Sequence, residues 1–480
     1  MLVTAAHADP RRWKALAVLG IAYLMVVLDV SIVNVALPVI QEDLGFTPED
    51  LQWVVSGYAL TFGGFLLLGG RIGDVLGRRR LFMIGLASFA AFSLLCGFST
   101  SSGMLIAARA LQGAAGAVLA PSVFSIVTVT FEEGAERNKA LGILGAIAGS
   151  GAAIGVLLGG VFTEYIGWEW IFFLNAPIAV AALLLTRRFV AESRLEGVQR
   201  HFDALGAATI TAALMMLVYA LTQANNAGWG SAQTIGLLLG SAALHGAFVV
   251  IEQRSPSPLV PLRFFRKRTP TGANIIGFGL GTIVFGMFFL LSLYQQQVLG
   301  FSALKTGVGY LAVALTAIAA SGVAQALVTR VGVKPILATG MVLLAGGLIW
   351  FTQISVDGSY VVDLLAGFLL IGVGMGFAFV PVSIAALAGV EPQEAGLASG
   401  LINTSEQIGG ALGVALLITV ATTRTESLLE SGEPAPEAFT SGYALAFWIG
   451  AAFAVISLIA TLVLLRRDEL QTAPAGVPAG

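Results

Sequence analysis

The chain is divided into a succession of apolar stretches, each long enough to cross a lipid bilayer as a single helix. About 20 apolar residues are needed to span a hydrocarbon core of roughly 30 Å. Only 11% of the residues are charged, whereas ordinary soluble domains contain about a quarter. A water-soluble domain could not bury so much apolar surface. We therefore predict an all-α integral membrane protein with about fourteen spans, near 15–38, 51–70, 81–99, 104–128, 138–160, 168–186, 204–222, 232–251, 271–294, 305–328, 334–352, 361–388, 400–422 and 442–465.

The basic residues indicate how these spans are oriented. All but three of the 25 Lys and Arg residues fall in the N-terminal segment, in every second loop or in the C-terminal tail. The exceptions are Lys305, Arg424 and Arg109, the last of which lies within a span. Basic residues collect on the cytoplasmic side, so both termini are predicted to be cytoplasmic, in a bacterial cytoplasmic membrane. A miscounted span would move every later loop to the wrong side, so the charge pattern supports an even count.

Two charged, proline-containing connectors, near 187–203 and 252–270, bracket one pair of predicted spans. This arrangement indicates six helices, a linking pair and six more helices. Repeated halves that enclose a central site are a common plan for transporters. We predict an N-terminal six-helix bundle at 1–186, a linking helix pair with its connectors at 187–270, and a C-terminal six-helix bundle with a short tail at 271–480.

The loop after the second span, GGRIGDVLGRRRLF at 69–82, combines glycines, one acid and four arginines. Glycine permits tight backbone turns, and a carboxylate can pair with arginines or accept from helix N-terminal amides. Such a cluster could hold two helix ends together in one conformation and release them in another, although a basic loop that merely fixes topology would also contain arginines. The residues of this predicted cytoplasmic latch are Gly73, Asp74, Gly77, Arg78, Arg79 and Arg80.

Two charged residues lie inside predicted spans at matching depths. At about 1.5 Å per residue, Asp29 and Arg109 both lie roughly 8 to 9 Å below the outer boundary of the hydrocarbon core. A lone charge at that depth is costly, so we expect the two residues to be partnered and to face a cavity. Gln112, about one turn from Arg109, would add a hydrogen bond. We predict that this group couples proton movement to transport, and the alternative is a static structural pair.

Glu406 is a further acid within a span, about 13 Å into its helix at 1.5 Å per residue. It could be a second proton-coupling site or a contact for a cationic substrate. It could equally be a carboxyl group satisfied by Asn403 or Gln407.

In the fifth predicted span, Gly151, Gly155 and Gly159 recur every four residues. A stripe of small residues lets another helix pack or slide closely. Structural packing alone explains this stripe about as well as a role in transport does.

These motifs resemble those of the major facilitator superfamily, in its fourteen-helix drug:proton antiporter branch. The resemblance covers nearly the whole chain: besides the latch loop, further segments match in order at the expected helices. It implies an antiporter glycine pattern at Gly142, Gly151, Gly155, Gly159 and Gly160, with Val156 where that pattern has proline. The other matching segments are LDVSIVNVALP (28–38), RALQGAAGA (109–117), WEWIFFLNAPI (168–178), YQQQVLGFSALKTG (294–307) and GLASGLINTSEQIGGALGVAL (396–416).

The sequence contains no motif for metal binding, for a catalytic triad or for ATP hydrolysis. His7, His201 and His245 are too scattered for a metal site or a catalytic triad, and a single cysteine cannot form an internal disulfide. The phosphate-binding loop of ATPases does not occur, so we expect an ion gradient rather than ATP to supply the energy. The sequence thus predicts neither an enzyme, a cofactor protein nor a nucleic-acid binder.

The sequence favours a monomeric, proton-coupled exporter of hydrophobic or amphipathic small molecules, such as antibiotics, in contact with the lipid bilayer. An uptake symporter on the same fold, which the valine at 156 favours slightly, and a non-transporting membrane sensor are the alternatives. The candidate cavity between the two halves is expected to be lined by Asn34, Trp53, Tyr58, Tyr294, Gln295 and Asn403.

Overall fold

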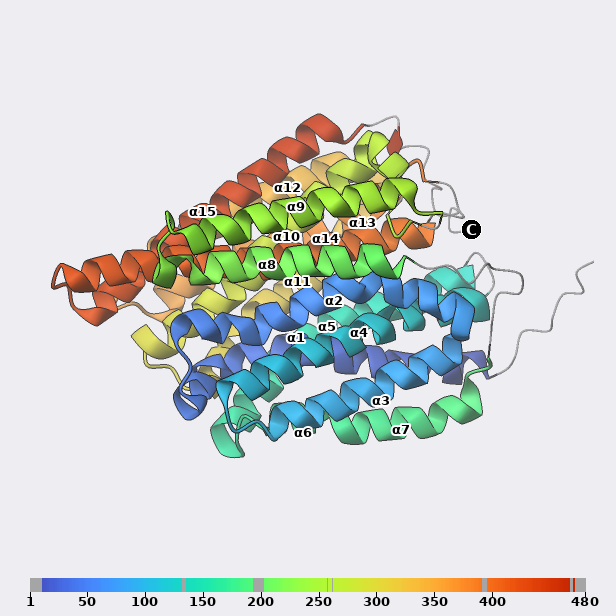
Figure 1. Ribbon diagram of the computed structural model, residues 1–480, viewed down its shortest axis with the longest axis horizontal. Helices are drawn as coiled ribbons and strands as arrows, with labels where there is room; N and C mark the ends of the chain where they lie inside the picture. The colour runs from blue at the N-terminus through green and yellow to red at the C-terminus, as the bar shows by residue number, and fades with distance from the viewer. Residues whose placement is uncertain are drawn as a thin grey trace, which may run out of the picture.

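The structure is a computed structural model that describes residues 11–131, 135–192, 203–256, 258–260, 262–390, 395–466 and 469–470. In these ranges every regular element is a helix, and the long helices run side by side along the longest axis of the molecule (Figure 1). The predicted all-α fold is therefore confirmed. The end at which α1 begins carries the arginine-rich loops and is called the basic end here; the other is called the far end.

The first six predicted spans form the N-terminal bundle. The sixth is broken at Leu174 into a short and a longer helix. The helices are α1 (Arg12–Leu44), α2 (Pro48–Leu76), α3 (Arg78–Gly97), α4 (Ser102–Thr130), α5 (Ala135–Tyr165), α6 (Trp170–Phe173) and α7 (Asn175–Phe189).

The linking pair consists of α8 (Ala204–Ala227) and α9 (Ala232–Arg254). Asp203 caps α8 by accepting from the Gly206 amide at 2.6 Å, as residues at helix N-termini commonly do. After α9 the connector folds back, because the buried Glu252 accepts hydrogen bonds from the backbone amides of Leu259 and Val260.

The C-terminal bundle begins after a short 3-10 turn at Leu262–Arg266. Two of its helices include a π-helical turn, η2 (Tyr294–Val298) after α10 and η3 (Tyr360–Leu365) before α13. The α-helices are α10 (Arg268–Leu293), α11 (Ala303–Val331), α12 (Val333–Phe351), α13 (Ala366–Leu387), α14 (Ala395–Glu430) and α15 (Ala435–Leu464).

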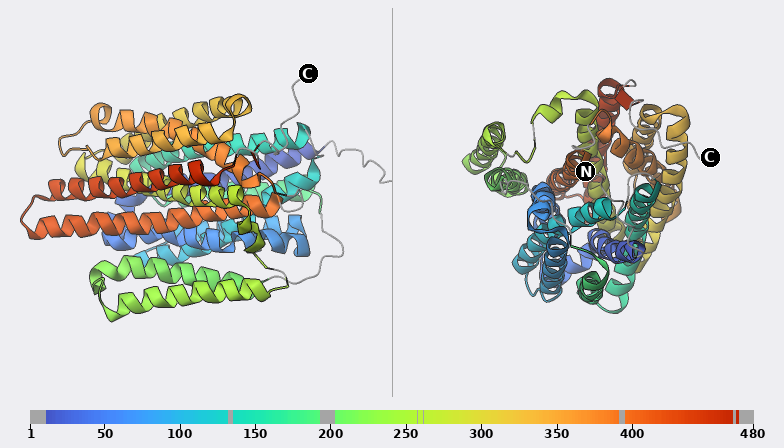
Figure 2. Two further views of the ribbon diagram at one scale, coloured as in Figure 1. Left: turned by 90° about the horizontal axis from the view of Figure 1, so that it is seen from above. Right: turned by 90° about the vertical axis from the view of Figure 1, so that its right-hand side faces the viewer.

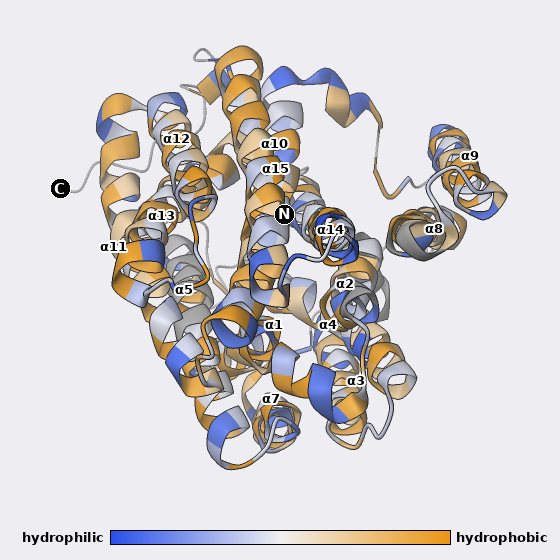
Figure 3. Cartoon of the chain, turned by 90° about the vertical axis from the view of Figure 1, so that its left-hand side faces the viewer, coloured by the Kyte–Doolittle hydropathy of each residue, from blue (hydrophilic) through white to orange (hydrophobic). Residues whose placement is uncertain are grey.

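In the part of the chain that the structure describes, eleven helices are long and apolar enough to cross a membrane. Two further helices contribute shorter apolar segments, Ile154–Tyr165 in α5 and Leu205–Leu221 in α8. The predicted count of fourteen spans thus stays a prediction. Hydrophobic residues occupy much of the length of the helices, as the colouring in Figure 3 shows, and some of their large side chains lie at the surface, including Leu239, which is 66% exposed. Such a surface fits contact with lipid acyl chains.

The two bundles make their close contacts away from the basic end. The outer part of α1, from Ile32 to Ile40, belongs to one hydrophobic core with α10, α13 and other C-terminal helices. Its inner part, from Ala15 to Val26, belongs to a separate core made of N-terminal residues. At the far end, Gln296 of η2 donates to the Val35 carbonyl at 2.9 Å, and Gln297 donates to Gln41 at 2.9 Å. The bundles are therefore closed on each other at the far end.

The linking pair covers one of the two seams between the bundles. Leu214 and Val218 of α8 pack in one cluster with Ala59 and Leu60 of α2 and with Ala411 of α14. Helix α9 packs on α8, and the pair stands at the edge of the molecule (Figure 2). The domain boundaries at 186 and 270 remain predictions, but α8 does bridge helices from both halves.

Candidate functional site

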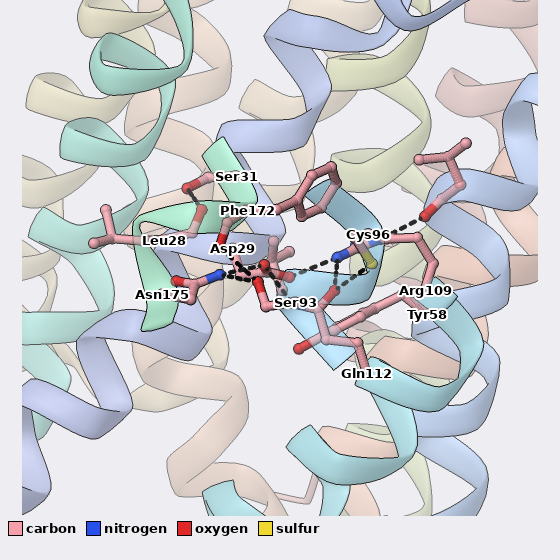
Figure 4. Close-up of polar contacts among 12 residues, drawn as sticks. Leu28, Asp29, Ser31, Tyr58, Ser93, Cys96, Arg109, Gln112, Phe172 and Asn175 are labelled. Carbon is pink, nitrogen blue, oxygen red and sulfur yellow. Dashed lines mark hydrogen bonds and ion pairs between the residues drawn. The ribbon is translucent and has the colours of Figure 1, made fainter. Parts of the chain in front are cut away.

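An ion pair lies in the middle of the N-terminal bundle (Figure 4). Arg109 of α4 donates from Nη1 to Asp29 Oδ2 of α1 at 2.6 Å. The relative exposure of Asp29 is 0% and that of Arg109 is 2%. Charges so deeply buried are tolerated when each is paired and its remaining hydrogen-bonding groups are satisfied. The structure thus brings together the two residues for which matching depths were predicted.

The other Asp29 oxygen accepts two further hydrogen bonds. Gln112 Nε2 donates to Oδ1 at 2.7 Å, and Asn175 Nδ2 at the start of α7 donates to it at 2.9 Å. Asn175 also contacts the Ser93 hydroxyl at 2.9 Å, and that hydroxyl donates to the Phe172 carbonyl at 2.8 Å. The carboxylate consequently ties α1 to α4 and α7, with α3 held through Ser93.

Arg109 is held on its other sides as well. Its Nε donates to the Val54 carbonyl of α2 at 3.0 Å, and Nη1 donates to Gln112 Oε1 at 2.8 Å. The guanidinium lies 4.3 Å from the ring centroid of Tyr58, within the range of a cation–π contact. Tyr58 is 1% exposed and packs on the guanidinium, so the prediction that it lines an accessible cavity is wrong for this conformation.

Asp29 and Arg109 are enclosed within the N-terminal bundle. The expectation that Asp29 and Arg109 face a cavity is not met, because both side chains are enclosed by the N-terminal bundle. A proton can reach this carboxylate only when the surrounding helices move. The site can therefore respond to the conformation of its own bundle, rather than to direct contact with a bound molecule.

Sequence reasoning missed three members of this network, namely Ser93, Cys96 and Asn175. Cys96 Sγ contacts Gln112 Oε1 at 3.5 Å, and all three residues are buried. Ser93 and Asn175 are polar residues within apolar stretches, a signal that could have suggested partners for Asp29. Which face of each helix they occupy is fixed by tertiary packing, which spacing along the chain does not reveal.

The remaining candidate cavity residues are placed differently from one another. Tyr294 and Gln295 are fully buried, and Asn34 is 8% exposed and donates to its own helix at Val30. Trp53 packs beside the α2, α8 and α14 cluster. Asn403 is exposed on α14. Of the predicted set, Asn403 is the residue with the most accessible surface in this conformation.

The predicted latch loop is partly described. Gly77 has φ +103°, a conformation that favours glycine, and a Cβ on it would lie 2.8 Å from Glu192 Oε1. Glu192, which follows α7, accepts from the Arg79 backbone amide at 3.1 Å and lies 3.7 Å from the Arg79 guanidinium. It lies 3.9 Å from that of Arg80. The side chain of Asp74 and the surroundings of Gly73 lie outside the described residues, and the buried Arg78 also has a partner.

We expect Glu192→Gln to slow transport severalfold without changing substrate affinity. Glutamine can still accept from the Arg79 amide, so the substitution chiefly removes the ion pairs with Arg79 and Arg80, and exposed ion pairs are worth about 0 to 1 kcal/mol. Initial rates over a range of substrate concentrations measure the effect. Glu433→Gln, at the far end, is the matched control, and an unchanged maximal rate in Glu192→Gln would show that the contact is only structural.

The glycine stripe of α5 packs against α1. A Cβ on Gly151 would lie 3.0 Å from Val27, one on Gly155 would overlap the Ser31 hydroxyl, and one on Gly159 would lie 2.6 Å from the Ile32 carbonyl oxygen. Gly160 instead faces α11, where a Cβ would lie 2.8 Å from the Leu304 Cα. Gly142 lies in α5, and its surroundings are outside the described residues. Helix α5 is thus pressed against its own bundle and, near the far end, against the other one.

We expect Gly307→Ala to disfavour closure of the far end. A Cβ on Gly307 of α11 would lie 2.5 Å from the backbone oxygen of Val156, and overpacking a tight contact costs about 1 to 3 kcal/mol. Distances between spin labels on the two bundles at the far end should lengthen, and transport should slow. Gly322→Ala, on the same helix with open space around its Cα, should change neither. Equal behaviour of the two variants would contradict this closure.

Among the described residues, no group of three or more His, Cys, Asp or Glu side chains is placed so that it could hold a metal ion. His245 contacts the hydroxyl and carbonyl of Ser241 on its own helix. His7 and His201 lie outside the described residues.

Comparison with known proteins places these features in a family. The model of the Major Facilitator Superfamily matches residues 19–414. Puromycin resistance protein pur8 of Streptomyces alboniger is 40% identical over 460 residues, covering 95% of this chain and 91% of its own length. Cephamycin export protein CmcT of Amycolatopsis lactamdurans is 40% identical over 466 residues, covering 96% of this chain and 94% of its own.

A solved structure agrees at the level of the fold. A bacterial homologue of the human lysosomal transporter Spinster, in an inward-facing and unoccupied conformation, superposes with a TM-score of 0.66. It covers 98% of this chain and 100% of its own at 15% identity, so it supports the arrangement of helices alone. Taken with the match along the sequence, the chain belongs to the Major Facilitator Superfamily.

Proposed function

We propose that this protein exports hydrophobic or amphipathic antibiotics and similar small molecules from a bacterial cell, driven by proton entry. The similarity to a puromycin resistance protein and a cephamycin export protein, each over more than nine-tenths of this chain, carries the proposal of export. A lincomycin resistance protein of Streptomyces lincolnensis, 33% identical over 96% of this chain, supports it. These relatives act on chemically different antibiotics, so the compound is left open.

Proton coupling is proposed for the Asp29 network. The carboxylate accepts three hydrogen bonds and neutralises a buried guanidinium. A protonated Asp29 must itself donate a proton and can no longer balance Arg109, so contacts that hold α1 to α4 and α7 weaken. Protonation would thereby favour a different packing of the N-terminal bundle, and loss of the proton would favour the packing described here.

Alternating access is the proposed consequence. The far end is closed by Gln296 and Gln297 against α1. If the basic end is cytoplasmic, as the basic loops predict, this conformation is the one that receives substrate from the cytoplasm. Protonation of Asp29 from outside would accompany the opposite conformation, and its release inside would restore this one. A monomer in the cytoplasmic membrane with both termini inside is sufficient for this cycle.

A resistance profile tests export. A pump-deficient bacterium expressing this chain should tolerate higher concentrations of at least one amphipathic antibiotic than the same host expressing Asp29→Asn. Everted vesicles separate export from uptake: an exporter dissipates an inside-acid proton gradient when substrate is added, whereas the alternative of an uptake symporter acts in the opposite orientation. Equal tolerance in both hosts across a broad panel would contradict the proposal.

A further inference from the structure

We propose that the Glu406 carboxylate on α14 binds the positive charge of a monocationic, aromatic or amphipathic substrate between the two bundles. The inference rests on the proposed export function and names a substrate class for it. It concerns a site apart from the buried Asp29 network.

The position of Glu406 is fixed by close helix packing. A Cβ on Gly281 of α10 would overlap the Glu406 backbone oxygen, and one on Gly277 would lie 3.4 Å from Glu406 Cγ. Helix α10 therefore holds this turn of α14 tightly. Next to it, Gln407 Cβ would lie 3.2 Å from a Cβ on Gly63 of α2. Glu406 thus lies where α10 and α14 meet the N-terminal bundle.

The Glu406 carboxylate has no ion-pair or hydrogen-bond partner within the part of the chain that the structure describes. Its neighbour Ser405 does have one, donating to Asn274 Oδ1 at 2.8 Å. The reading of Glu406 as a carboxyl satisfied by Asn403 or Gln407 is therefore not supported. Glu406 is partly exposed and Asn403, one turn earlier, is exposed, so this face of α14 is open to an incoming molecule.

Aromatic side chains lie on the helices near Glu406. Tyr23 of α1, in the opposite bundle, lies within electrostatic reach of Glu406 and packs edge-on against Phe124 at 5.2 Å. Phe285 of α10 meets α14 one turn further along, where a Cβ on Gly410 would lie 2.8 Å from its ring. All three rings are partly exposed. A carboxylate beside aromatic faces suits an organic cation, because both attract positive charge.

The charges of Asp29, Arg109 and Glu406 favour a substrate with a single positive charge. Asp29 is already neutralised by Arg109 and is fully buried, which leaves Glu406 as the acid without a counter-charge between the bundles, among the residues that the structure describes. An unpaired carboxylate at membrane depth is costly, so a cation that pairs with it recovers part of that cost. A dication would bring one charge without a counter-charge.

Two probes of nearly the same shape test the charge. Methyltriphenylphosphonium is a monocation with three phenyl rings on phosphorus, and triphenylphosphine oxide is neutral with the same three rings. Their binding is measured on the purified full-length protein in lipid nanodiscs. Glu406→Gln should lose about tenfold or more in affinity for the cation while its affinity for the neutral probe changes less than about twofold. Glu430→Gln, on the same helix at the far end, should bind both probes as the unmodified protein does.

A second variant, Glu406→Asp, distinguishes loss of the charge from misfolding of the protein. Glu406→Asp keeps the charge on a shorter side chain, so it should still prefer the cation, more weakly than the unmodified protein. The proposal is overturned if Glu406→Gln weakens both probes equally, if it weakens neither, or if the unmodified protein binds neither. These outcomes leave the export function to be judged separately by the resistance profile of the Asp29→Asn variant.

Discussion

Asp29→Asn is expected to reduce uphill export to the background of cells that lack the protein. Asparagine keeps the shape of the side chain but cannot bind and release a proton, and in the structure this carboxylate accepts from Arg109, Gln112 and Asn175. Export is measured as drug accumulation in energised cells, with the membrane level of the variant determined by immunoblot. Substrate binding should persist, because Asp29 is enclosed by its own bundle.

Loss of the charge also leaves Arg109 unpaired, which costs about 3 to 5 kcal/mol when an ion pair is buried. Asp29→Asn should therefore melt at a lower temperature. The double variant Asp29→Asn with Arg109→Gln removes both charges and should recover much of that stability, yet remain uncoupled. If the double variant exports at the unmodified rate, the network is structural and Glu406 becomes the candidate for proton coupling.

Arg109→Ala is expected to abolish export for a different reason. An isolated buried carboxylate is so costly that it takes up a proton instead, so Asp29 should hold its proton throughout the cycle. Infrared spectroscopy at neutral pH should show a protonated carboxyl band in Arg109→Ala that disappears when Asp29→Asn is added. Removal of the guanidinium also deprives the Val54 carbonyl and the Tyr58 ring of their partner.

Arg109→Lys provides the matched control for that experiment. Lysine keeps the charge but offers one ammonium group in place of a planar fork, so it cannot reach Asp29, Gln112 and the Val54 carbonyl together. We expect Arg109→Lys to retain partial export and to lack the carboxyl band. A carboxyl band of equal size in both variants would contradict the assigned role of the positive charge.

The sequence predicts the paired charges because depth along a helix is simple arithmetic. It predicts Asp29 and Arg109 at the same depth in the membrane, and in the structure Arg109 Nη1 lies 2.6 Å from Asp29 Oδ2. It did not predict that they are sealed from any cavity, or that Asn175 and Tyr58 surround them, because those facts depend on how α1, α2 and α7 rotate against each other. Hydropathy cannot specify a rotation when a helix is apolar on most of its faces.

The latch loop and the glycine stripe of α5 also have partners that the sequence did not identify. A charge cluster was predicted after the second span, yet the acid that contacts Arg79 in the described structure is Glu192, more than a hundred residues later. The spacing of Gly151, Gly155 and Gly159 predicted a close helix contact, but only the structure identifies α1 as the partner. Long-range partners of this kind are set by tertiary packing.

The most direct test of the central claim, proton-driven export through Asp29, is made with purified protein in liposomes that contain a pH-sensitive dye. Substrate added to one side without an imposed pH gradient should move protons in the opposite direction across the membrane, and Asp29→Asn should move none. Proton movement in the same direction as substrate would show a symporter. Equal proton movement by the unmodified protein and Asp29→Asn would contradict the assignment of coupling to this carboxylate.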